Sequence, residues 1–176
     1  CNNTGTDNVA IGRGAMNFAT GGTANVAIGQ NALYSNTAGL YNVVVGSSAL
    51  RSNTTGCRNI ALGQNALYYS ETGCYNVALG YAAAQRQTAS GYNIAIGYGS
   101  LTQLTGLTSE NNVAIGCGAD GQKRGGCNNV AIGEEAMLGK STDYTTHACG
   151  SIAIGHRSQY CNSSGKYNLS IGTGSL

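Results

Sequence analysis

Short apolar segments recur along the chain, each ending with Gly and all but one beginning with Asn. Between them stand a Val, Ile or Leu, then a small residue, then an Ile, Leu or Val. The motif begins at Asn8, Asn25, Asn42, Asn59, Asn76, Asn93, Asn112, Asn129, Ser151 and Asn168. Seven of the nine intervals are 17 residues, and the other two are 19 and 22. A period this regular predicts an array of one repeated structural unit.

The apolar residues of the motif alternate with a small one. Counting the motif Asn as position 0, the large apolar residues stand at +1 and +3, and Ala stands at +2 in most copies. A period of two is typical of a strand with one buried face. We therefore expect the +1 and +3 columns to fill the core and the Ala column to face outward. The Gly at +4 and the frequent Gly at −3 predict corners, because glycine adopts positive φ without penalty.

A 17-residue unit is too small to bury its own apolar side, so the units must stack and share one core. The sequence thus predicts an all-β protein, a single-domain β-solenoid (a parallel β-roll) of ten coils with a 17-residue repeat. The domain covers 1–176, with insertions of two residues before Asn112 and five before Ser151. At a strand spacing of about 4.8 Å, ten coils span roughly 48 Å. Identical amides on successive coils predict a ladder of hydrogen bonds along the Asn column, at a corner of the coil.

Composition removes several classes of protein. Gly is 28 of 176 residues, only 9% are charged and Pro is absent, which argues against a disordered chain and against a helical bundle. The net charge of +2 is scattered, so nucleic acid is not an expected partner. No apolar stretch reaches the roughly 18 residues of a membrane span. Seven cysteines favour an oxidising compartment.

Two runs, NVAIGQNALYSNTAG (25–39) and NIALGQNALYYSETG (59–73), resemble known fibre sequences. They are similar to the repeat arrays of phage tail-fibre and bacterial surface-fibre proteins and to the heads of trimeric autotransporter adhesins. The resemblance covers essentially the whole chain. It implies a left-handed parallel β-roll, a location at a cell or virion surface, and trimers. The adhesin heads have coils near 14 residues, and this chain departs from them with 17.

Four cysteines share position −2 of the repeat. Cys57 and Cys74 stand on consecutive coils, as do Cys127 and Cys149. Neighbouring coils bring Cα atoms about 4.8 Å apart, within the range of a disulfide. The spacing predicts the disulfides Cys57–Cys74 and Cys127–Cys149; a column of reduced thiols is the alternative.

Cys1 and Cys161 both fall at position +10 of the 17-residue repeat. The last residue, Leu176, stands at +8, so the chain stops one residue short of the position at which it begins. This phase predicts subunits that stack head to tail as a homopolymer, with Cys161 bonded to Cys1 of the next subunit. Two alternatives stay open: a piece of a longer fibre, and a lipoprotein with lipid on Cys1. Cys117 has no cysteine on adjacent coils, so it is expected to be a free thiol or a lateral bridge.

Catalytic and cofactor motifs are weak. The G-x-G-x-x-G match at 116–121 lacks the helix that holds a pyrophosphate. Position +5 carries Cys117, Glu134 and His156 on three successive coils, but two coils place about 9.6 Å between thiol and imidazole. No zinc or calcium pattern is present. We expect no enzyme, no cofactor and no metal.

Surface features complete the expectations. Sequons at Asn2, Asn53 and Asn162 share position +11 and are candidate glycosylation sites. Tyrosines recur at −1 and +9, as a stacking column or a sugar-binding strip. The Ala strip is the expected surface for lateral or trimeric association. Ice binding is a distant alternative that needs a regular Thr array, which Glu71 interrupts at −5.

These patterns together favour an extracellular structural protein that assembles head to tail into a disulfide-stabilised filament. The alternative is a trimeric phage tail-fibre or adhesin shaft.

Overall fold

The computed structural model describes residues 4–102, 109–121, 126–139, 149–161 and 165–175. Within them, ten three-residue parallel strands form one sheet whose order follows the sequence. The strands are β1(Val9–Ile11), β2(Val26–Ile28), β3(Val43–Val45), β4(Ile60–Leu62), β5(Val77–Leu79), β6(Ile94–Ile96), β7(Val113–Ile115), β8(Val130–Ile132), β9(Ile152–Ile154) and β10(Leu169–Ile171). The predicted all-β solenoid with a repeat of 17 residues is confirmed.

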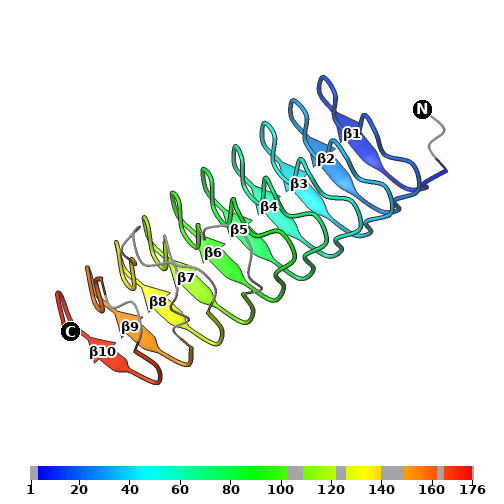
Figure 1. The fold of residues 1–176 in the computed structure, drawn as a ribbon. Helices are drawn as coiled ribbons and strands as arrows, with labels where there is room; N and C mark the ends of the chain where they lie inside the picture. Colours follow the sequence, from blue (N-terminus) through cyan, green and yellow to red (C-terminus); the bar gives the residue numbers. More distant parts are fainter. Residues whose placement is uncertain (1–3, 103–108, 122–125, 140–148, 162–164, 176) are drawn as a thin grey trace.

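Every strand pairs in the same register with the next one. Val26 lies beside Val43, and the pairing is equally in phase where the sequence interval is longer, as at Ile94 beside Val113 and Val130 beside Ile152. The insertions therefore leave the sheet unchanged; residues 103–108 and 140–148, between these strands, lie outside the described residues. The coils build an elongated rod with the two chain ends at opposite ends (Figure 1).

The two faces of the sheet are reversed relative to the prediction. Ala61 and Ala78 at +2 are fully buried, whereas Ile60 and Leu62 at +1 and +3 lie on the outside. The expectation that Val, Ile and Leu columns fill the core is wrong, and so is an outward Ala strip. The interior of a 17-residue coil also holds the Ala at +7 and the Leu at +8, as with Ala66 and Leu67. The space left at +2 therefore suits a small side chain.

The corners of the coil contain residues with positive φ, and these include larger residues as well as glycines. Gly80 at +4 has φ 132, and a Cβ there would lie 2.6 Å from the carbonyl oxygen of Gly97 on the next coil. Larger residues also adopt left-handed backbone at −1, +6 and +8, as Tyr75 (φ 60), Asn65 (φ 59) and Leu67 (φ 52) show. This backbone is uncommon for non-glycine residues. Stacking holds it in place: the Leu67 amide donates to the carbonyl of Ala83 at 3.0 Å.

Candidate assembly interface

The Asn column forms a hydrogen-bond ladder inside the rod. The Asn59 amide nitrogen Nδ2 donates to Oδ1 of Asn42 (3.1 Å) and to the carbonyl of Gly73 (2.8 Å), while its Oδ1 accepts from the backbone N–H of Asn76 (3.0 Å). Where Ser151 replaces Asn, its N–H donates to Asn129 Oδ1 and its hydroxyl accepts from the N–H of Asn168. The same rung-to-rung bond links Asn8, Asn25, Asn42, Asn59, Asn76, Asn93, Asn112 and Asn129.

A second buried polar column stands at +11. Asn53 is fully buried, and its Nδ2 donates to Asn36 Oδ1 (2.8 Å) and to the carbonyl of Gly56 (3.1 Å). Asn53 is therefore inaccessible to a glycosylation enzyme, and its prediction as a glycan site is wrong. Asn2 and Asn162 lie outside the described residues. In the sequence, Asn36 and Asn53 are each followed three residues later by a Gly. This recurring spacing was the signal for a second polar column.

The cysteines at −2 lie in pairs on adjacent coils. The N–H of Cys57 donates to Cys74 Sγ (3.1 Å), and that of Cys127 donates to Cys149 Sγ (3.2 Å). The Sγ atoms of Cys127 and Cys149 are 2.8 Å apart, which is longer than a disulfide bond. The described cysteines are all free thiols, so both disulfides stay predictions for an oxidised form. Hydrogen bonding to Cys149, together with burial, raises the pKa of Cys127 above its ordinary value.

The remaining cysteines occupy different settings. Cys117 is exposed, and its role as a free thiol or a lateral bridge stays a prediction. Cys161 is half-buried, and its N–H donates to the carbonyl of Leu138 on the preceding coil (2.9 Å). Its predicted partner Cys1 lies outside the described residues, so the intersubunit disulfide stays a prediction.

An aliphatic outer face runs the length of the rod. It consists of the +1 and +3 residues of all ten strands, and no charged residue belongs to it. Many of these side chains are more than a third exposed: Val9, Ile11, Val43, Val45, Ile60, Leu62, Ile94, Ile132, Ile152, Ile154, Leu169 and Ile171. Ten coils at about 4.8 Å make this face roughly 48 Å long. Exposed apolar faces of that size are often interaction surfaces, so this outer face replaces the Ala strip as the surface predicted for lateral association.

Aromatic and guanidinium groups stack along one margin of the outer face, at −1. The Arg58 guanidinium lies between the rings of Tyr41 (5.4 Å) and Tyr75 (5.3 Å), and it donates to the Tyr75 hydroxyl at 2.9 Å. Tyr75 in turn stacks on Tyr92 with ring centroids 4.9 Å apart. The same order recurs at +9, where Arg51 lies between Tyr34 and Tyr68. Ring-on-ring stacking is therefore seen at −1, between Tyr75 and Tyr92, whereas at +9 a guanidinium stands between the rings.

The two ends of the sheet each present an open strand edge. β1 pairs only with β2, and β10 pairs only with β9, among the described residues. The outer-face side chains of β10, Leu169 and Ile171, are 66% and 65% exposed, against 39% and 37% for Ile60 and Leu62 in β4. A further coil in the same register would cover both the backbone edge and this apolar surface.

The part of the chain that the structure describes also bears on metal binding, on membrane spanning and on the role of the Thr column. It contains no group of three or more His, Cys, Asp or Glu side chains placed to hold a metal ion. It also has no helix long and apolar enough to cross a membrane. The Thr hydroxyls at −5 donate to the carbonyl of the following coil, from Thr20 to Thr37 (3.1 Å) and from Thr37 to Thr54 (2.9 Å), so they serve the stack.

Comparison of the chain with protein-family models, curated proteins and solved structures found no match.

Proposed function

We propose that this chain is an extracellular, non-enzymatic structural protein that assembles end to end into a disulfide-stabilised β-solenoid filament. The observation that carries the proposal is the register that every strand from β1 to β10 repeats without a break. An incoming coil meets the same row of backbone donors and acceptors that each strand already offers its neighbour. A head-to-tail contact of this kind does not close, so it produces a filament.

The thiol arrangement supports the oxidised, extracellular form. Cys127 and Cys149 already approach at 2.8 Å across neighbouring coils, so oxidation requires little movement. Structural disulfides persist outside the reducing cytosol. A Cys127–Cys149 disulfide would keep the rod from opening at the insertion before Ser151.

Electrophoresis under non-reducing conditions tests the intersubunit link. We expect a ladder of multimers that collapses to a single band with reductant and that is lost in Cys161→Ser. Cys117→Ser is the matched control, because it removes an exposed thiol that lies on a different column, and it should retain the ladder. A ladder that survives Cys161→Ser but disappears in Cys117→Ser would show that the covalent contact is lateral, contrary to the proposal.

The second candidate is a laterally associated shaft, a trimer in particular, and the aliphatic outer face favours it. Between the −1 column and the +5 column, over all ten coils, this face covers roughly 1,000 Å². One partner buries about that much surface in a stable interface. In this arrangement chains lie side by side with their outer faces toward a common axis. Sedimentation separates the two candidates: a shaft gives a fixed mass of three chains, whereas end-to-end assembly gives masses that grow with concentration.

A further inference from the structure

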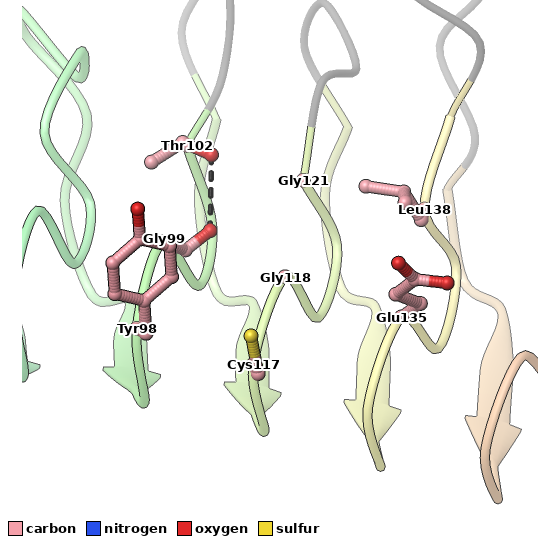
Figure 2. A pocket seen from close by; sticks show the side chains of 8 residues that line it. All are labelled: Tyr98, Gly99, Thr102, Cys117, Gly118, Gly121, Glu135 and Leu138. Carbon is pink, nitrogen blue, oxygen red and sulfur yellow. Dashed lines mark hydrogen bonds between the residues drawn. The ribbon is translucent and has the colours of Figure 1, made fainter.

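A hollow of about 250 Å³ opens on the side of the rod across coils 6, 7 and 8, which are the coils that contain β6, β7 and β8. Tyr98, Gly99 and Thr102 of coil 6 form one wall, and Glu135 and Leu138 of coil 8 form the other. The floor is coil 7, with Cys117, Gly118 and Gly121. Figure 2 shows Tyr98 and Glu135 on opposite sides of the opening, with the floor between them.

The hollow exists because coil 7 lacks side chains where other coils have them. It has Gly at both +6 and +9, where coil 4, for instance, has Asn65 and Tyr68. Gly99 on coil 6 is also a +6 glycine, and a Cβ built on it meets no atom within 4 Å. Gly118 adopts φ 63, and a Cβ there would touch only Glu135, at 3.8 Å.

The hollow continues an aromatic stack that stops at coil 6. The rings of Tyr81 and Tyr98 at +5 are nearly parallel, with centroids 5.3 Å apart. The next residue in this column is Cys117, so no ring of coil 7 covers the second face of Tyr98, which is 63% exposed. Coils 6 and 8 are about 9.6 Å apart. A flat ring placed midway would lie about as far from Tyr98 as Tyr81 does.

The two walls differ in chemistry, and this difference selects the ligand. Tyr98 offers a π face, which suits an apolar C–H surface. Glu135 offers a carboxylate; its Oε2 accepts from Arg157 Nε at 2.6 Å, and a carboxylate has acceptor capacity for several donors. A pyranose combines a C–H face with hydroxyl donors, whereas a hydrocarbon ring would desolvate the carboxylate without replacing its hydrogen bonds. The volume lies below that of drug-sized pockets and matches a single ring.

We propose that this hollow binds one neutral sugar ring of a glycan, stacked on Tyr98 and hydrogen-bonded to Glu135. An acidic sugar is disfavoured because its carboxylate would face that of Glu135. The site lies within one chain and away from both ends of the rod, so its occupation does not depend on end-to-end assembly.

Saturation-transfer difference NMR with methyl glucoside, methyl galactoside and methyl mannoside tests the proposal, since it observes the ligand and works for single chains and filaments alike. We expect saturation of the ring protons of at least one glycoside. Tyr98→Ala should weaken binding roughly tenfold, because it removes the stacking surface. Gly118→Asn should abolish binding by filling the hollow; Asn31 and Asn65 show that Asn fits the backbone at this position.

Gly174→Asn is the matched control, since Gly174 is the +6 glycine of coil 10, with φ 64 and open space around it. It should bind as the unaltered chain does. No saturation with any glycoside, or equal saturation in Gly118→Asn, would overturn the proposal. Binding of p-cresol in place of the glycosides would also overturn it, because the site would then select an aromatic ring.

Discussion

The inner and outer faces of the ten-stranded sheet use apolar residues for opposite purposes. Inside, the +2 column is mostly Ala, and it is fully buried from Ala27 to Ala153, beside the Asn ladder. Outside, the larger Val, Ile and Leu side chains face solvent along the whole rod. On the strands, the inner face thus carries mostly small side chains and the outer face carries the larger ones. The inner face holds the coil together, and the outer face is available for association, so substitutions on the two faces should have separable effects.

Enlarging the inner face should give the largest loss of stability. Ala78→Leu adds three carbons to a fully buried position, and we expect overpacking to lower the free energy of unfolding by about 3 kcal/mol. Val44, which is also buried at +2, is the largest residue that this column holds. Val77→Leu, one residue earlier on the outer face, should change stability by less than about 0.5 kcal/mol. Denaturant unfolding of both variants measures the difference; similar losses would contradict the assignment of the faces.

Breaking the ladder should have the next largest effect. Asn59→Ala removes the bonds to Asn42 and Gly73 and leaves the N–H of Asn76 without its acceptor. Buried groups left unpaired should lower stability by about 2–3 kcal/mol. Gln64→Ala, at an exposed position of the same coil, is the control. Hydrogen exchange should show faster exchange at Asn76 in the first variant and not in the second.

Oxidising the thiol pair should raise stability by about 2 kcal/mol. The pKa of Cys127 is raised, mainly by its hydrogen bond to Cys149, so the reactive thiolate is scarce at neutral pH. The rate of disulfide formation should therefore increase as the pH rises toward and through that pKa. Mass spectrometry of the oxidised chain measures both the rate and the pairing. A rate that falls with rising pH, or a Cys127 bonded to any residue except Cys149, would contradict the arrangement.

Polar substitution on the outer face should have the smallest effect on folding. The double variant Ile60→Ser and Leu62→Ser alters two side chains that are 39% and 37% exposed, and it should cost the single chain about 1 kcal/mol. Lateral association, measured by sedimentation, should weaken because the apolar contact is interrupted mid-rod. Unchanged lateral association would remove the outer face as an interface.

The repeat was sufficient to predict the period, the parallel stack and the Asn ladder, because each depends on identical residues recurring every 17 positions. It did not by itself say which side of the strand is inside. Asn59 at 0 and Ala61 at +2 are two residues apart, so their side chains point to the same face of the strand. A ladder predicted in the interior would therefore have predicted a buried Ala as well. We expected the ladder at a corner instead, and so assigned the Ala column to the outside.

Local conformation and the hollow beside Tyr98 were harder to foresee. Leu67 and Tyr75 adopt positive φ although neither residue favours it, because hydrogen bonds between coils impose the backbone on every repeat. No propensity scale contains that effect. The hollow beside Tyr98 depends on Gly118 and Gly121, which stand where other coils have larger side chains. This difference becomes visible only when coil 7 is aligned with its neighbours.

Electron microscopy of the purified chain under oxidising conditions tests end-to-end assembly most directly. We expect long unbranched filaments with an axial repeat near the roughly 48 Å of ten coils, shortening when reductant is added. Isolated rods one chain in length, at every concentration and in either redox state, would contradict assembly through the open edges of β1 and β10.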